Sequence, residues 1–304
     1  MAEALAPWGI SRVTVQRAIA AGGVLLNGRT ASVSQHLSKG AVVTIAALPH
    51  PEGVALEPQA IPLAVVYEDE DLVVINKPRG LVVHPAKGTP SGTLVNALLY
   101  RYGALEGQSP SDSSDEDTEA DVRPGIVHRL DKDTTGLMVI ARSERAGRYL
   151  RAQILARSVH RGYLAVVRGH PAGQFMIDAP IGRSPDHVRM AVTPRGRPAR
   201  THGKLRSFYS GTPPYSLVEL DLETGRTHQI RVHLAFAGFP VACDPLYGQP
   251  ALDRAAGLTA GGQLLHAYRL SFRHPADDRV MACEEPPPDD FAAALDVLQR
   301  RAPS

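Results

Sequence analysis

The sequence predicts an α+β fold with a mostly antiparallel central sheet. Three observations predict it: short apolar strand patterns outnumber helical ones, few strand–helix–strand units are visible, and there is no internal repeat. A chain of 304 residues is long enough for more than one domain. We expect a small module over residues 1–46, a proline-rich linker over 47–62 and a larger domain over 63–304.

The small module shows the pattern of a helix followed by a hairpin. Positions that can line one helix face are Ile10, Val13, Ala18 and Ile19. Gly22-Gly23 ends this helix, and Asn27-Gly28 predicts a tight turn between two strands. Residues 42–45 suggest a closing strand.

The larger domain mixes strands with short helices. The predicted strands lie at 64–67, 71–75, 163–167 and 216–222. Helices are predicted after the caps Thr93 and Ser143, and a third from Thr227 to Ala237, with Gly238 as its stop. In the third helix we expect Ile230, Leu234 and Ala237 to face the core, and we interpret His233 as a core histidine.

Residues 103–122 interrupt the larger domain with a low-complexity acidic segment, which we expect to be a disordered surface insertion. Of the 31 acidic residues seven lie there, without any Lys or Arg. The rest of the chain therefore carries 33 basic and 24 acidic residues, a net charge of +9. A basic surface favours a polyanionic partner such as nucleic acid.

Several classes of protein are disfavoured. No apolar run approaches the roughly 18 residues of a membrane span, and the N-terminus does not resemble a signal peptide. Cys243 and Cys283 form no metal or redox motif, so we expect reduced thiols in a cytoplasmic protein. Without a P-loop or a G-x-G-x-x-G fingerprint, we expect no cofactor, and we expect a monomer.

The segment 125–142 is the densest group of candidate site residues. Its charged residues are His128, Arg129, Asp131, Lys132 and Asp133, with apolar residues on both sides. Charged groups are costly to bury unless they are paired, which favours a site over a piece of core. A solvated turn between two strands is the alternative.

A second dense segment covers residues 222–234. Arg226 lies just outside the N-terminus of the predicted helix, where anions are favoured. His228 and His233 are five residues apart rather than four, so a metal site is not predicted.

Together these segments resemble the RluA/RluD family of pseudouridine synthases. Residues 128–137 resemble its active-site signature, and 222–234 its third motif. Residues 76–88 resemble its first motif, and 163–169 hold the place of an active-site tyrosine. The likeness covers about residues 63–275 in several ordered blocks, and it is nearest to the RluD-type enzymes of large-subunit ribosomal RNA.

The resemblance implies the pseudouridine-synthase fold and a role for each matched residue. Asp131 is the catalytic aspartate, acting as nucleophile or base, and Arg226 is its cationic partner. Tyr163 stacks on the target base and can assist loss of the C5 proton. Further substrate-binding residues are Arg129, which fills the place of the flipped base, His128 and Ile230. The chemistry needs no cofactor and no metal.

The small module resembles the S4 RNA-binding fold. The residues expected to face RNA phosphates are Arg12, Gln16, Arg17 and Lys39. The expected partner is RNA, and the implied substrate is 23S rRNA, with a tRNA enzyme of the same family or a non-catalytic RNA-binding protein as alternatives. An aspartic hydrolase built on Asp131 and Asp133 is disfavoured, because Asp133-Thr134-Thr135-Gly136 is not the D-[ST]-G motif of those proteases and the sequence holds no second copy.

Overall fold

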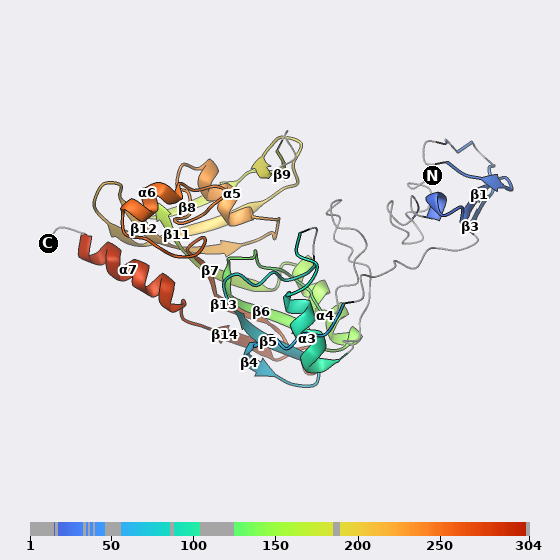
Figure 1. Cartoon of the computed structure of the whole chain (residues 1–304), viewed down its shortest axis with the longest axis horizontal. Helices are drawn as coiled ribbons and strands as arrows, with labels where there is room; N and C mark the ends of the chain where they lie inside the picture. The colour runs from blue at the N-terminus through green and yellow to red at the C-terminus, as the bar shows by residue number, and fades with distance from the viewer. Residues whose placement is uncertain are drawn as a thin grey trace. The chain divides into compact units, whose positions relative to one another are not determined.

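In the computed structural model, two compact units can be described, and Figure 1 labels their elements. The description covers residues 15, 18–32, 35, 37–38, 40–45, 56–85, 88–103, 125–184 and 189–301. The described residues up to 57 belong to a small unit, and those from 58 onward to a large unit. Four predicted RNA contacts, Arg12, Gln16, Arg17 and Lys39, lie outside the described residues, as does the acidic insertion after Gly103.

The small unit is a three-stranded antiparallel sheet with the order β2-β1-β3. Its strands are β1 (Val24–Leu26), β2 (Arg29–Thr30) and β3 (Val43–Ile45). The predicted turn at Asn27-Gly28 is confirmed: both residues have positive φ angles, 51° and 78°, as the tightest hairpin turns require. Its buried core consists of Val15, Ala18, Ile19, Val24, Leu26 and Ala31.

The large unit is built on a nine-stranded sheet with the order β4-β5-β6-β13-β7-β12-β11-β8, to which β14 adds beside β13. Its first elements are β4 (Ala64–Glu68), β5 (Leu72–Lys77), α3 (Leu94–Tyr102), β6 (Thr135–Ala141), α4 (Glu144–Leu155), β7 (His160–Arg168) and β8 (Gln174–Asp178). A separate hairpin follows, formed by β9 (Ile181–Arg183) and β10 (Met190–Val192). The remaining elements are β11 (Arg200–Tyr209), β12 (Tyr215–Leu222), α5 (Gln229–Phe236), α6 (Pro250–Ala255), β13 (Leu265–Arg273), β14 (Val280–Glu284) and α7 (Asp289–Arg301).

The mostly antiparallel character predicted from the sequence is confirmed. Within the sheet of the large unit, β6 and β13 are parallel and every other described pairing is antiparallel. All seven residues of β6 are buried, as expected for a central strand that is covered on both faces. Helix α4 packs against β6 and β13, and α7 contributes Phe291 and Leu298 to a second core with Tyr215 of β12.

A glycine allows the close approach of β6 to β13. Gly136 has a φ of 112°, and a Cβ atom there would lie 2.3 Å from the Ala267 carbonyl oxygen. No side chain fits that space, so only glycine brings the two strands this near. The segment 131–134, which enters β6, is thereby held against the middle of the sheet.

Helix starts were predicted with mixed success. Ser143 caps α4 as predicted, since its Oγ accepts the Ala146 N–H. The cap predicted at Thr227 is wrong: α5 begins after His228, which has a left-handed φ of 56°. The Gln229 side-chain oxygen accepts the Arg226 N–H and so closes the preceding turn in place of a threonine cap. Ala237 is exposed rather than core-facing.

Candidate active site

Asp131 forms an ion pair with an arginine that lies one hundred residues later in the chain. Its Oδ2 accepts a hydrogen bond from Arg231 Nη1 at 2.9 Å. Asp131 lies in the loop before β6, with 15% of its side chain exposed, whereas Arg231 projects from α5 with 6% exposed. The loop is thus open enough to admit a substrate to the carboxylate, while its counter-charge is buried.

A second carboxylate fixes the orientation of Arg231. Asp244, which is fully buried, accepts hydrogen bonds from Arg231 Nε at 2.7 Å and Nη2 at 2.8 Å. Asp244 also accepts the backbone N–H groups of Leu246 and Tyr247. Burial alone would lower the pKa of Arg231, but the Asp244 bonds and the charge of Asp131 raise it overall. Arg231 therefore stays charged and presents Nη1 to Asp131.

The partner predicted for Asp131 was Arg226, but the structure places Arg231 there. Arg226 lies in the loop before α5, and its Nε donates to the Pro198 carbonyl at 3.2 Å. Arg231 lies on the buried side of α5 and reaches the loop before β6. The sequence signal that indicates Arg231 is its place inside the apolar stretch of the predicted helix, between Ile230 and Val232.

Tyr163 of β7 lies beside the end of the Asp131 loop. It pairs with Ala267 of β13, which also pairs with Gly136 at the start of β6. The side chain is buried, and burial raises the pKa of its hydroxyl, with a smaller contribution in the same direction from the Asp131 charge. Tyr163 is therefore a protonated phenol within the electrostatic reach of Asp131.

Three side chains hold the loop that carries Asp131. The bonds run from Lys77 Nζ to the Lys132 carbonyl at 2.8 Å, from Arg79 Nη1 to the Asp133 carbonyl at 2.7 Å, and from Gln263 Nε2 to Thr134 Oγ1 at 3.0 Å. Lys77 is fully buried, and burial lowers its pKa to about 7 against the opposing charges of Asp131 and Asp133. Bonds to consecutive residues make the loop rigid, which keeps Asp131 in position.

Of the other predicted substrate contacts, His128 and Arg129 precede this loop in the chain, and Ile230 lies in α5. His128 Nε2 accepts the Val139 N–H at 3.0 Å, and burial lowers the pKa of this imidazole to about 3, so the ring is neutral. Arg129 is exposed, with its charge accessible to solvent. Ile230 is buried in the first turn of α5. His128 thus supports the strand after the loop, while the Arg129 side chain is exposed to solvent.

A histidine and a tyrosine that the sequence analysis did not assign complete the surroundings of Asp131. His228 Nε2 lies 3.9 Å from Asp131 Oδ1. The His228 Nδ1 and the Tyr247 hydroxyl are hydrogen bonded at 2.9 Å, and the Arg231 guanidinium lies over the Tyr247 ring at 5.2 Å. Tyr247 thus contacts both side chains that flank the Asp131 carboxylate.

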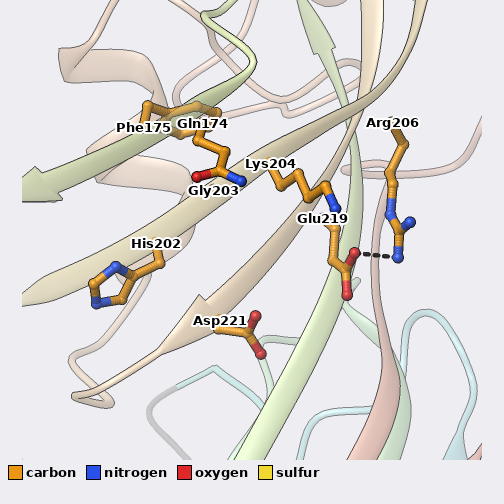
Figure 2. A pocket seen from close by; sticks show the side chains of 8 residues that line it. All are labelled: Gln174, Phe175, His202, Gly203, Lys204, Arg206, Glu219 and Asp221. Carbon is orange, nitrogen blue, oxygen red and sulfur yellow. Dashed lines mark ion pairs between the residues drawn. The ribbon is translucent and has the colours of Figure 1, made fainter.

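A polar pocket on the sheet lies apart from these residues. It is lined by Gln174, Phe175, His202, Gly203, Lys204, Arg206, Glu219 and Asp221 (Figure 2). Glu219 pairs with Leu164, whereas the next residue, Leu220, pairs with Tyr163. Since successive residues of a strand point to opposite faces, Glu219 and Tyr163 project from opposite sides of the sheet. The pocket is therefore separate from the Asp131 site.

Neither a metal site nor a membrane-spanning helix is found among the described residues. No group of three or more His, Cys, Asp or Glu side chains in the described ranges could hold a metal ion. None of the described helices has the length and apolar character needed to cross a membrane.

Comparison with known proteins identifies the family of the chain. The family model described as RNA pseudouridylate synthase matches residues 71–236. The chain belongs to this RNA pseudouridine synthase family. An uncharacterised RNA pseudouridine synthase of Chloroflexus aurantiacus is 49% identical over 294 residues, which cover 96% of this chain and 87% of that protein. Ribosomal large subunit pseudouridine synthase D of Nitrosomonas europaea is 40% identical over 303 residues, covering 98% and 83%.

A solved structure agrees with the family assignment. Human RNA pseudouridylate synthase domain containing 1 has a TM-score of 0.56 and 27% identity, covering 75% of this chain and 84% of that one. The pseudouridine synthase is thus an isomerase of the RluA/RluD type, as the sequence motifs predicted. The matched segment includes Asp131, Tyr163 and Arg231, while Asp244 and Tyr247 lie beyond its end.

Proposed function

We propose that this pseudouridine synthase modifies uridines of large-subunit ribosomal RNA and that Asp131 is its catalytic carboxylate. The observation that carries the assignment of Asp131 is its ion pair with the buried, doubly anchored Arg231. The substrate is proposed from the relatives, since the Nitrosomonas europaea and Xanthomonas campestris proteins are named ribosomal large subunit pseudouridine synthases. A cytoplasmic location is part of the same proposal, because these relatives are bacterial and bacterial ribosomal RNA is made in the cytoplasm.

The reaction breaks the N1–C1′ bond of uridine and joins C5 to C1′. Nothing is oxidised or reduced, and the C5 proton is lost while N1 gains one. Asp131 must be ionised to act as nucleophile or base, and Arg231 stabilises that form. The pair uses Oδ2, which leaves Oδ1 toward the substrate. Tyr163, buried next to the loop, can stack on the base and assist removal of the C5 proton.

The target nucleotide must leave its stack to reach a carboxylate that is only 15% exposed. Arg129, exposed two residues before Asp131, is proposed to hold the vacated position in the RNA. The small unit is proposed to be an S4-like RNA-binding module that uses Arg12, Gln16, Arg17 and Lys39. The basic excess of the chain outside the acidic segment supports this, because phosphate contacts dominate affinity for RNA.

Mapping of pseudouridines tests the proposed substrate. Large-subunit rRNA and a tRNA pool are incubated with the protein or with its Asp131→Asn variant, and the products are read by carbodiimide labelling and primer extension. New marks on rRNA with the unmodified protein alone support the proposal. Marks confined to tRNA would show that tRNA is the substrate, while the proposed chemistry would still hold. A shift in RNA mobility with no mark on either RNA would favour a non-catalytic RNA-binding protein.

A further inference from the structure

The carboxylate of Asp131 is flanked by two different side chains, of which only one is engaged with it. Arg231 bonds Oδ2 at 2.9 Å, whereas His228 Nε2 lies 3.9 Å from Oδ1. The second distance exceeds that of a hydrogen bond. The His228 side chain is 25% exposed. Its Nε2 is therefore near the reacting carboxylate and still open to a bound nucleotide.

The backbone at His228 adopts a left-handed conformation, which is uncommon for residues other than glycine. Its φ of 56° lies in the left-handed region, which Asn and Gly adopt more readily than histidine. Backbone strain of this kind occurs at functional sites when the surrounding structure maintains it. Here the turn is maintained by Gln229, whose side chain accepts hydrogen bonds from Thr224 Oγ1 and the Arg226 N–H. The hydrogen-bonded turn therefore fixes the direction in which the His228 side chain leaves the start of α5.

Tyr247 determines which nitrogen of His228 carries the proton. Burial raises the pKa of Tyr247 to about 12 and lowers that of His228, so a neutral phenol faces a neutral imidazole. The Tyr247 oxygen accepts the Met190 N–H at 3.2 Å. His228 Nδ1, at 2.9 Å, is the acceptor that the described residues offer to the Tyr247 hydroxyl, so we assign the hydroxyl as the donor of this bond. With Nδ1 accepting, the imidazole proton is on Nε2, the nitrogen that faces Asp131.

We propose that the Nε2–H of His228 donates a hydrogen bond to an oxygen of the target uridine, a base carbonyl or a ribose hydroxyl, beside Asp131. Tyr247 is the positioning residue, because it fixes the imidazole tautomer through its hydroxyl and supports Arg231 through its ring. One tyrosine thereby positions both side chains that flank the Asp131 carboxylate. This inference rests on the proposed function, since it assigns a contact to the substrate of that same site.

The test uses two substitutions of His228 that differ in where they place an amide. His228→Gln puts its side-chain N–H near the position of Nε2, and His228→Asn puts it near Nδ1, away from Asp131. We expect His228→Gln to keep kcat/KM within about threefold and His228→Asn to lose about tenfold, the loss typical of one neutral hydrogen bond. Asparagine is well tolerated at a left-handed φ, so a loss in His228→Asn does not reflect backbone strain.

Tyr247→Phe tests the positioning role in two backgrounds. It keeps the ring over Arg231 and removes the hydroxyl. We expect a loss of about fivefold in kcat/KM with native His228 and less than twofold in His228→Gln, where no tautomer has to be fixed. Equal losses in both backgrounds, or a His228→Asn variant as active as the unmodified protein, would overturn the inference.

A measurement on the protein with its native His228 gives a second check. Nitrogen-15 NMR of the histidine-labelled protein reports the tautomer of each ring, with His228→Gln used to assign the signal. We expect a neutral His228 protonated at Nε2, and protonation at Nδ1 would overturn the inference. The unmodified protein is assayed for pseudouridine on rRNA in parallel. If it forms none, the proposed function fails, whatever the tautomer.

Discussion

Arg231 and Arg269 each lie between two carboxylates, on opposite faces of the same sheet, but their surroundings differ. Arg231 is 6% exposed and uses three nitrogens, two toward Asp244 and one toward Asp131. Arg269 is 38% exposed and reaches Glu219 and Asp221 with Nη2 alone, at 3.3 and 3.7 Å. Figure 2 shows Glu219 and Asp221 among the side chains that line the pocket on that face, with Arg206 also paired to Glu219.

The difference is that the guanidinium of Arg231 is buried and fixed, whereas that of Arg269 is partly exposed to solvent. Exposed ion pairs are screened by water and contribute little, whereas a buried charge that loses its partner is costly. Arg231 is therefore expected to be indispensable and Arg269 replaceable, although both are arginines paired with two acids. The comparison also shows that a cluster of charges indicates a site only when burial and hydrogen bonds fix its geometry.

Replacing each arginine by methionine should give the largest difference in stability. Arg231→Met leaves Asp131 and Asp244 without their cation, and Asp244 is fully buried. We expect a loss of about 3–5 kcal/mol in the free energy of unfolding. Arg269→Met should cost less than about 1 kcal/mol, because Arg269 is 38% exposed and Glu219 keeps its bonds to Arg206 and the Tyr268 hydroxyl. Urea unfolding of both variants measures the two costs, and equal costs would remove the distinction between the faces.

Neutralising one carboxylate on each face should separate their effects on activity. Asp244→Asn removes one of the two oxygens that hold Arg231, so Nη1 is no longer fixed toward Asp131. We expect a loss of about 10- to 100-fold in kcat/KM with the fold retained, as for other residues that orient a functional group. Asp221→Asn is the matched control and should stay within twofold. A rate assay on the same RNA decides, and an unaffected Asp244→Asn would contradict the account of Arg231.

Acidification should have a smaller effect on stability, which arises from the buried His128. Burial lowers the pKa of His128 from 6.5 to about 3, so on acidification the unfolded chain binds this proton before the folded chain does. Neutral His128 therefore contributes its full stabilisation above pH 6.5. This contribution decreases as the pH falls toward 3, and it is about 2 kcal/mol smaller at pH 5. His128→Gln can still accept the Val139 N–H but does not titrate. Urea unfolding at pH 7 and pH 5 should show the extra loss in the unmodified protein and not in His128→Gln.

The sequence was most informative where the signal is local. The Ser143 cap, the Asn27-Gly28 turn and the antiparallel character of the sheet depend on neighbouring residues and on alternation, and all three are confirmed. The family motifs also identified the isomerase, because several ordered blocks had to agree. Asp131 and Tyr163 stay predictions for the catalytic residues, although the structure brings them to one side of the sheet.

The sequence was least informative about contacts between distant segments. Asp131, Arg231 and Asp244 are joined by the loop before β6, helix α5 and the segment after it, and no periodicity encodes that meeting. Placing the helix cap at Thr227 also drew attention to Arg226, whereas the left-handed turn at His228 starts the helix one residue later. The partner of a charged residue is decided by tertiary packing, which local patterns do not report.

One measurement tests most directly whether the ionised Asp131 carries the reaction. Single-turnover rates of pseudouridine formation are compared for Asp131→Asn and Asp221→Asn on the same RNA. Both substitutions preserve size and remove one negative charge, on the two opposite faces. The account predicts at least a thousandfold loss for Asp131→Asn, about 4 kcal/mol of transition-state stabilisation, and a rate within twofold for Asp221→Asn. An Asp131→Asn variant within tenfold of the unmodified rate would contradict it.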